Sequence, residues 1–178
     1  MSERLGATVA TSSRSDRLPE RSLSPESGAG LCLRAMTASD LDEVMAIEQR
    51  IYPFPWTRGN FADSIASGYD MPVLEIAGRI AAYAAVMRGP DEVHLLNLSV
   101  DQTYQGRGLG RRLLEQLLRN AQLRGALGML LEVRPSNTLA SRLYRSMNFE
   151  TIGVRRRYYP SWGGSREDAI VMRRSLCP

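Results

Sequence analysis

Three glycines at alternate positions, Gly106, Gly108 and Gly110, constrain the fold of this chain more than any other feature. They stand between an apolar run typical of a strand and an apolar stripe typical of a helix. Glycine lets the backbone approach a ligand closely and turn its N–H groups toward an anion. The start of the following helix adds unpaired donors and the positive end of its dipole. Since Arg107 and Arg111 add full charges, the segment predicts a binding site for a pyrophosphate group.

Three phosphate-binding motifs compete for this segment. A Walker A loop needs a lysine, and the chain contains none. A Rossmann fingerprint would place Gly or Ala where Arg111 stands, and it would open a βαβ unit rather than follow an antiparallel meander. The remaining match is the (Gln/Arg)-x-x-Gly-x-(Gly/Ala) signature of the GCN5-related N-acetyltransferases (GNAT), through Gln105, Gly108 and Gly110. A glycine-rich turn that only lets strand and helix pack stays open as an alternative.

The hydrophobic pattern around this turn predicts an α+β domain. Strand-like runs occur at 31–34, 73–77, 80–87, 93–100, 129–133, 149–157 and 169–174. Helix-like stripes start near Thr37, Thr57, Leu109 and Ser136 or Asn137. Short turns join the runs between 73 and 100, so these should be antiparallel neighbours, whereas the later alternation of helix and strand favours a parallel pair. We expect the GNAT fold: a mixed, mostly antiparallel sheet of about six or seven strands, flanked by about four helices.

Composition sets the domain boundary and excludes several classes of function. Residues 1–30 are poor in large apolar side chains and predict a disordered or loosely attached tail, with the acetyltransferase domain over 31–178. The net charge is +4, but it is dispersed apart from residues 155–157, which suits a phosphorylated co-substrate better than RNA or DNA. No apolar run is long enough to span a membrane, and the N-terminus does not read as a secretory signal. Two cysteines without metal-like spacing and a single histidine, His94, favour a cytoplasmic protein without a metal site, monomeric by default.

A series of motifs in fixed order carries a more specific resemblance. They are IEQR at 47–50, FPW at 54–56, NLSV at 97–100, YQGRGLG at 104–110, LEVR at 131–134, SN at 136–137, LY at 143–144, RRYYP at 156–160 and REDAIVM at 166–172. In these motifs the chain from about Leu31 resembles the RimI family of ribosomal-protein alanine N-acetyltransferases. Gly106 departs from the family, which usually has a polar residue there. The resemblance implies acetyl-CoA as co-substrate and a protein N-terminus as acceptor, above all the N-terminal alanine of ribosomal protein eighteen of the small subunit.

Acetyl transfer to an amine requires a neutral nitrogen and a stabilised departing thiolate. An α-amino group has a pKa of about 7.7–8.0, against about 10.4 for lysine, so a modest base suffices for an N-terminus. Glu132 lies inside an apolar strand, where a carboxylate facing a wet cleft is a candidate base. The resemblance also assigns the role of base to Glu132. It assigns to Tyr144 the role of the acid that protonates the departing thiolate. The alternatives are a strand-end glutamate paired with Arg134 and a tyrosine that only fills the core.

The remaining candidate residues bind the co-substrate or the peptide. The resemblance implies that the backbone of the strand before the glycine turn holds the thioester arm, with an added hydrogen bond from the side chain that opens the fourth helix. The expected co-substrate site comprises Leu98, Ser99, Val100, Gln105, Gly106, Arg107, Gly108, Leu109, Gly110, Arg111 and Asn137. The expected peptide groove is walled by loop aromatics flanked by prolines: Phe54, Trp56, Tyr158 and Tyr159. Glu48, Glu167 and Asp168 are further candidates, as negative charge for a basic N-terminal tail.

Three functions fit these residues. The first is an N-terminal acetyltransferase of the RimI type. The second is an acetyltransferase of the same fold for a small amine or a lysine. The third is a CoA-binding regulatory module without turnover, or an RNA-associated protein. Retention of Glu132 and Tyr144 argues against the module. The paired tyrosines 158 and 159 favour a peptide groove over a pocket for a small amine.

Overall fold

The computed structural model describes residues 30–177, so all but the last residue of the predicted tail lies outside the described residues. The strands in this part are β1 (Leu31–Ala35), β2 (Pro72–Ile76), β3 (Arg79–Arg88), β4 (Glu92–Val100), β5 (Gly128–Val133), β6 (Glu150–Pro160) and β7 (Arg166–Ser175). The α-helices are α1 (Leu41–Ile51), α2 (Arg58–Ala66), α3 (Leu109–Leu123) and α4 (Thr138–Ser146). Short 3-10 turns are η1 (Ala38–Asp40), η2 (Gln102–Tyr104) and η3 (Trp162–Gly164).

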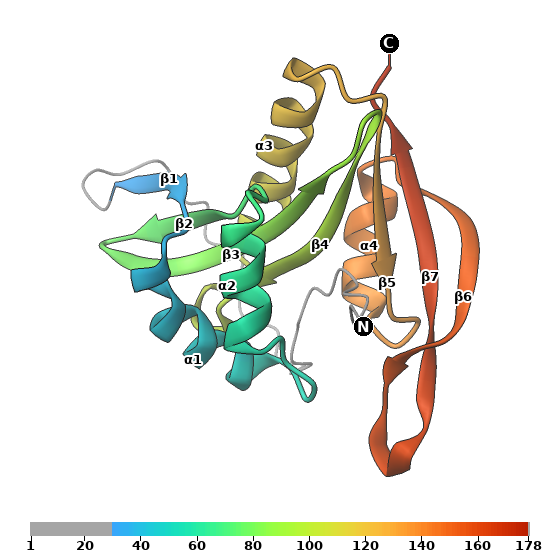
Figure 1. Ribbon diagram of the computed structural model, residues 1–178, viewed down its shortest axis with the longest axis horizontal. Helices are drawn as coiled ribbons and strands as arrows, with labels where there is room; N and C mark the ends of the chain where they lie inside the picture. The colour runs from blue at the N-terminus through green and yellow to red at the C-terminus, as the bar shows by residue number, and fades with distance from the viewer. Residues whose placement is uncertain (1–29, 178) are drawn as a thin grey trace, which may run out of the picture.

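All these strands form one twisted sheet in the order β1-β2-β3-β4-β5-β7-β6 (Figure 1). The β4–β5 pair is parallel, and every other neighbouring pair is antiparallel. The prediction of a mixed, mostly antiparallel sheet is therefore confirmed. The parallel pair arises because α3 carries the chain from the end of β4 back to the start of β5.

Helices cover both faces of the sheet, because the strands bury side chains on both sides. Helices α1 and α2 pack on one face with Tyr83 and Leu96, whereas α3 and α4 pack on the other with Leu95 and Leu98 (Figure 1). Leu95 and Leu96 are neighbours in sequence but belong to different cores. Leu98 shares the core of Leu95 because a bulge in β4 between these two residues shifts the alternation by one. Each face of β4 is therefore sealed by its own helix pair.

Local sequence fixes the ends of two helices next to the later site. Thr57 precedes α2, and its hydroxyl accepts the backbone N–H of Asn60 at 3.2 Å. Asn137 precedes α4, and its side-chain oxygen accepts the N–H of Ala140 at 3.1 Å. Each side chain replaces an acceptor that the first turn of a helix lacks. Both capping predictions are confirmed.

One element differs from its prediction. The last hairpin is longer than expected, and Tyr158 and Tyr159, expected in a loop, lie inside β6. The sequence pattern did not predict these two residues in a strand because β6 has a bulge between Arg155 and Tyr159. Within the bulge, Arg157 has a left-handed φ of 52°. A bulge breaks the alternation on which strand prediction depends. The carboxylate of Asp168, opposite in β7, accepts the Arg157 N–H at 2.8 Å and holds the bulge.

Candidate active site

The two parallel strands at the centre of the sheet separate part-way along their length. Pairing of β4 with β5 runs from Glu92 opposite Gly128 to Leu95 opposite Leu131 and then stops. At the same point β4 carries a bulge against β3, since Ala85 pairs with Asn97 but Val86 pairs with Leu95. The bulge bends β4 away from β5. From Leu96 to Val100 the edge of β4 that faces β5 is therefore outside the β4–β5 ladder.

The glycine turn lies directly beyond this opening. Gly106 and Gly108 have φ values of 75° and 76°, the left-handed region that glycine adopts without strain. Gly110 lies in the first turn of α3, where an added Cβ would stand 3.4 Å from a methyl group of Val100. The turn therefore needs glycine for its backbone conformation at positions 106 and 108, whereas position 110 has room for a Cβ at the limit of ordinary contact.

A groove of about 420 Å³ runs between this turn and α4. Its lining joins the end of β4, the glycine turn and one side of α4: Val100, Tyr104, Gln105, Gly106, Gly108, Leu109, Gly110, Arg111, Leu139, Arg142, Leu143 and Ser146. One end offers the N-terminus of α3 and arginines, and the other offers aliphatic side chains. Such a groove fits an elongated ligand with a phosphorylated end and an apolar arm.

Most of the predicted co-substrate residues line this groove, but four do not. Leu98 and Ser99 are fully buried in β4. Arg107 lies over the ring of Tyr104 at 5.5 Å, and Asn137 caps α4. Within the groove, Gln105 has a structural role as well, since its amide donates to the Val100 carbonyl at 3.0 Å and ties the turn to the strand.

Glu132 lies at the opening on the face covered by α1 and α2, and its side chain is 1% exposed. One carboxylate oxygen is 2.5 Å from Nε2 of His94, and the other is 3.1 Å from Nε of Arg155. The expected alternative partner, Arg134, instead forms an ion pair with Glu167 at 3.3 Å. Two donors thus hold the buried carboxylate in one orientation. The sequence did not reveal the contact with His94, because 38 residues separate the two side chains.

Tyr144 projects from α4 into the core on the opposite face and is fully buried. Its hydroxyl has no hydrogen-bond partner in the part of the chain that the structure describes. Burial raises the pKa of this phenol, so the group keeps its proton. A buried hydroxyl without a partner costs free energy. The arrangement leaves one donor ready for an acceptor that the described residues do not supply.

Aromatic side chains from two distant segments gather on the α1/α2 side of the opening. Phe54, between α1 and α2, stacks on Trp162 at the tip of the last hairpin, with ring centroids 5.2 Å apart. The guanidinium of Arg134 lies 4.2 Å from the Tyr159 ring centroid and 5.9 Å from that of Phe54. Tyr158 meets Tyr159 edge-on at 5.0 Å. We call Phe54, Arg134, Tyr158, Tyr159 and Trp162 the aromatic wall.

Trp56, also predicted in the peptide groove, is mainly a core residue, 8% exposed and stacked on Phe61 at 5.1 Å. Trp162 and Arg134 were missed. The signal for Trp162 was an aromatic residue in the Pro- and Gly-rich segment 160–164, and the signal for Arg134 was its place two residues after Glu132 in an extended strand. Trp162 lies beside Phe54, and Arg134 beside Tyr159, only because the hairpin folds back toward α1.

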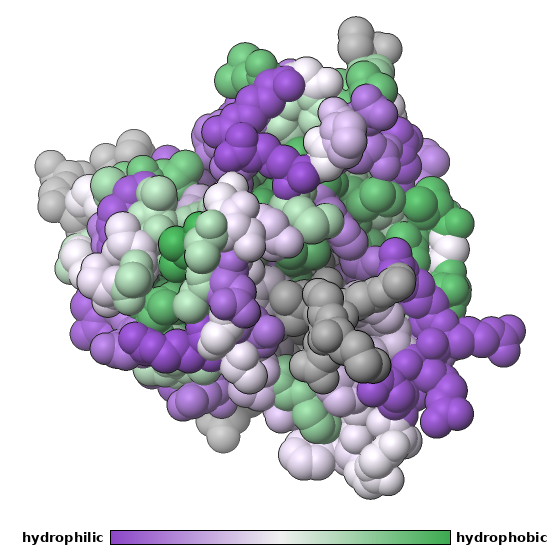
Figure 2. Space-filling model, in the orientation of Figure 1, coloured by the Kyte–Doolittle hydropathy of each residue, from purple (hydrophilic) through white to green (hydrophobic). Residues whose placement is uncertain are grey.

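The three acids expected to attract a basic peptide are buried or engaged within the protein. Glu48 is 1% exposed and lies near Phe54 and Arg134. Glu167 accepts the Ser136 N–H at 2.8 Å and pairs with Arg134, and Asp168 holds the bulge. Figure 2 shows hydrophilic side chains projecting over β6 and β7, and β6 itself carries the three arginines 155–157. The hairpin beside the aromatic wall is therefore basic rather than acidic.

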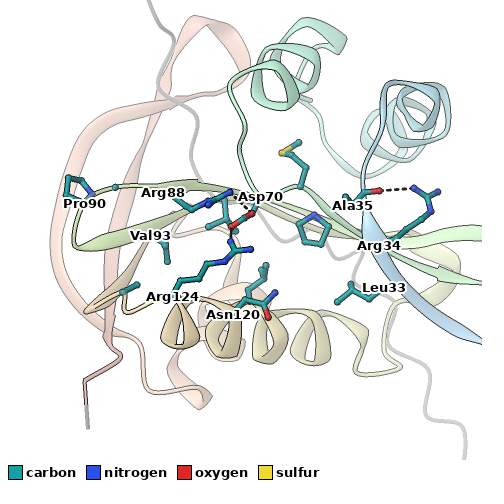
Figure 3. A pocket seen from close by; sticks show the side chains of 16 residues that line it. Leu33, Arg34, Ala35, Asp70, Arg88, Pro90, Val93, Asn120 and Arg124 are labelled. Carbon is teal, nitrogen blue, oxygen red and sulfur yellow. Dashed lines mark hydrogen bonds and ion pairs between the residues drawn. The ribbon is translucent and has the colours of Figure 1, made fainter.

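A second cavity, of about 350 Å³, lies away from these groups between β1, β3 and α3 (Figure 3). Arg88 and Arg124 both point to Asp70 there and form ion pairs with it. Its central charges are thus already paired, and it contains none of the candidate residues. Among residues 30–177 no cluster of His, Cys, Asp or Glu could hold a metal ion, and no helix there is long and apolar enough to cross a membrane.

Comparisons with known proteins agree with this geometry. Residues 41–149 match the model of the acetyltransferase (GNAT) family. The chain is 41% identical over 140 residues to the [ribosomal protein bS18]-alanine N-acetyltransferase of Escherichia coli K12, covering 79% of this chain and 94% of that protein. The crystal structure of the ribosomal-protein-S18-alanine N-acetyltransferase from Escherichia coli superposes with a TM-score of 0.78 at 39% identity, over 84% of this chain and 96% of that one. Arabidopsis thaliana NAA60 in complex with acetyl-CoA shares the fold at 19% identity, with a TM-score of 0.72 over 82% and 99% of the two chains. The chain belongs to the GNAT family of acetyltransferases, in its RimI branch.

Proposed function

We propose that this protein transfers the acetyl group of acetyl-CoA to the N-terminal α-amino group of a protein, specifically the N-terminal alanine of ribosomal protein bS18. The observation that carries the proposal is the opening between β4 and β5, where their pairing stops after Leu95 opposite Leu131. The groove beside the glycine turn leads to it from the α3/α4 face, and the aromatic wall borders it on the α1/α2 face. The similar Escherichia coli enzyme supplies the choice of alanine and bS18.

The groove fits acetyl-CoA in charge and in shape. The N–H groups of the glycine turn and the N-terminus of α3, with Arg111 beside them, would hold the pyrophosphate. The aliphatic side chains of Leu139 and Leu143 would pack on the pantetheine arm. The β4 backbone at Leu98, Ser99 and Val100 would hold the arm and the thioester oxygen, a contribution of a few kcal/mol for each well-placed donor. When bound, the co-substrate supplies an activated acetyl group.

Glu132 and Tyr144 would move the protons. Glu132 would accept a proton from the attacking nitrogen, and its contact with His94, whose side chain is 20% exposed, gives that proton a route to solvent. Tyr144 would donate its unpartnered hydroxyl hydrogen to the departing sulfur. Because its pKa is raised, Tyr144 would stay protonated until sulfur carries negative charge.

The substrate indicates where the enzyme works, and the presence of both binding surfaces on one chain indicates its assembly state. A ribosomal protein is made and modified where ribosomes assemble, so we place the enzyme in the cytoplasm. We further propose that it works as a monomer without binding nucleic acid, since one chain carries both the groove and the aromatic wall.

The test is acetyl transfer to matched peptides. Wild-type protein with acetyl-CoA should acetylate a peptide that begins Ala-Arg, and should leave untouched the same peptide with a blocked N-terminus and an internal lysine. Mass spectrometry locates the acetyl group. Glu132→Gln should lower kcat by about 100-fold, the usual contribution of a general base. Transfer to lysine alone would contradict the proposal, and transfer to free amino acids or small amines alone would support the small-amine alternative.

A further inference from the structure

A buried carboxylate on the α1/α2 side of the opening, predicted from the sequence only as negative charge for a basic tail, takes no part in the proton transfers described above. Glu48, on α1, is 1% exposed, and in the described residues no arginine or histidine forms an ion pair with it. Its neighbours are neutral donors. The Tyr83 hydroxyl donates to one oxygen, and the other accepts the Trp56 N–H at 3.1 Å and the Asn97 amide at 3.4 Å. A buried carboxylate without a cation is costly, so its retention calls for a reason.

A small cavity gives that reason. Glu48, Tyr52, Phe54, Asn97 and Arg134 are among the residues that line a space of about 20 Å³. A site needs about 10–15 Å³ to admit one water molecule, and an ammonium group is about as large as water. The space therefore admits one –NH₃⁺ group but not a side chain. Arg134, its one cationic neighbour, is engaged with Glu167 at 3.3 Å.

The donors and acceptors around the cavity leave one acceptor site open. A carboxylate offers about four lone-pair positions, and Glu48 uses three. Asn97 turns its N–H toward Glu48, and its oxygen accepts from Ser99 at 2.7 Å. The Tyr52 hydroxyl, 2.8 Å from Ser99, completes the chain. These bonds hold the Asn97 side chain in place, so Asn97 does not occupy the cavity and, being neutral, does not neutralise Glu48.

We propose that this cavity receives the amino end of the acceptor substrate as its ammonium ion, with the Glu48 carboxylate as counterion. The inference rests on the proposed function and deepens it. Asn97 and Ser99 belong to the part of β4 beyond its pairing with β5, and Arg134 directly follows the end of β5 at Val133. The cavity therefore borders the opening from the α1/α2 side, while the co-substrate groove approaches from the α3/α4 side.

The subsite also explains how the ammonium loses its first proton. Two protons leave the nitrogen in the full reaction: one is released to solvent, and one balances the thiolate that becomes CoA thiol. In the subsite one ammonium N–H bond breaks and an O–H bond forms on Glu48, which leaves a neutral amine and a neutral carboxylic acid. This proton is the one released to solvent when Glu48 ionises again. The second proton leaves on attack, toward Glu132, and exchange with solvent then restores the proton that Tyr144 gave to sulfur. The titratable and charged groups around Glu48 are Tyr83 from β3, Tyr52 after α1 and Arg134 after β5.

The proton affinity of Glu48 fits an α-amine better than a lysine. Burial raises the pKa of Glu48 to about 7, although the hydrogen bond from Tyr83 opposes the rise. An α-ammonium, with a pKa of about 7.7–8.0, gives its proton to such a group at a cost below about tenfold in the equilibrium. A lysine ammonium, at about 10.4, gives it at a cost above about a thousandfold. The subsite thus selects the α-amino group over a lysine by its acidity.

Kinetics of Glu48→Gln test this role. With the Ala-Arg peptide, the variant should raise the peptide KM by about tenfold or more, the typical loss for a charge-assisted hydrogen bond, and should leave the KM for acetyl-CoA within about twofold. A peptide with propionyl in place of alanyl lacks the amine, and its inhibition constant should be the same in both proteins. Glu43→Gln, on the same helix but in a surface pair with Arg79, is the matched control and should keep the wild-type peptide KM.

The outcomes separate this inference from the proposed function. If the wild type acetylates the peptide and Glu48→Gln keeps its KM, the subsite is wrong and the function stands. If the propionyl peptide loses affinity to the same extent, Glu48 is only structural and the inference fails. If the wild type acetylates no α-amine, both fail. Should Glu48→Gln not fold, Tyr83→Phe keeps the carboxylate but removes a donor that lowers its pKa, so the acidic limb of the kcat/KM profile must move to higher pH. An unmoved limb would overturn the inference.

Discussion

At the scale of single residues, the site separates three ionisable groups by their surroundings. Glu132 contacts His94 and Arg155, Glu48 accepts from neutral donors, and the Tyr144 hydroxyl has no hydrogen-bond partner among the described residues. Burial among neutral donors raises the pKa of Glu48, and burial raises the pKa of Tyr144. The two carboxylates and the phenol therefore have different surroundings although all three are buried. Such divergence is what acid–base chemistry in one small volume requires.

The raised pKa of Glu48 predicts how stability depends on pH. Because the folded pKa lies above the unfolded one, the neutral carboxyl favours folding fully below pH 4.5, and this contribution is lost as pH rises through about 7. The shift from 4.5 to about 7 corresponds to about 3 kcal/mol. Between about pH 4.5 and about pH 8, wild type should lose about 3 kcal/mol more unfolding free energy than Glu48→Gln. Urea unfolding of both proteins at the two pH values measures this difference. Parallel curves would mean that Glu48 ionises freely in the folded protein.

At the scale of elements, the strand β7 positions groups that the sequence presented as part of the site. Arg166 donates to the carbonyl of Arg157 at 2.7 Å and to that of Tyr158 at 2.5 Å. Glu167 holds the turn before α4, and Asp168 holds the bulge. None of the three faces the opening. This end of β7 is therefore a scaffold that fixes the aromatic wall and the start of α4 relative to each other.

This scaffold gives a prediction for the hairpin. Arg166→Gln removes the donors that fix Arg157 and Tyr158, so the aromatic wall should lose its fixed position and the peptide KM should rise about threefold to tenfold. The KM for acetyl-CoA should not change, and stability should fall by only about 1 kcal/mol, since these bonds are exposed. Arg173→Gln, at the other end of β7 in a pair with Glu92, is the control. An unchanged peptide KM in Arg166→Gln would show that the wall needs no such support.

The sequence predicted elements well and contacts unevenly. The strands and helices follow from apolar periodicity, and the helix starts at Thr57 and Asn137 follow from local hydrogen bonds, so one segment suffices to predict them. The bulge at Arg157 and the pairing of Glu132 with His94 depend on segments far apart in the chain. Their geometry exists only once the sheet has formed. A local signal for the subsite was present nonetheless: Asn97 and Ser99 are polar residues in the otherwise apolar run 95–100.

At the scale of the whole molecule, the sheet works as a partition between the two substrates. The co-substrate groove belongs to the face of α3 and α4, and the aromatic wall and the Glu48 cavity belong to the face of α1 and α2. The faces communicate where β4 and β5 no longer pair. Because an intact ladder would close this passage, the bulge that separates the strands is what makes reaction between the two ligands possible. A substitution in one binding surface should then change the KM of one substrate and leave that of the other unchanged.

Independence of the two faces can be measured with two surface variants. Leu139→Asp puts a negative charge in the groove and should raise the KM for acetyl-CoA about tenfold with an unchanged peptide KM. Trp162→Ala removes an exposed part of the aromatic wall and should raise only the peptide KM. In the double variant the two losses in free energy should add to within about 0.5 kcal/mol, as for sites without shared partners. A larger coupling would mean that the two substrates meet on one face, and the assignment of the faces would have to be abandoned.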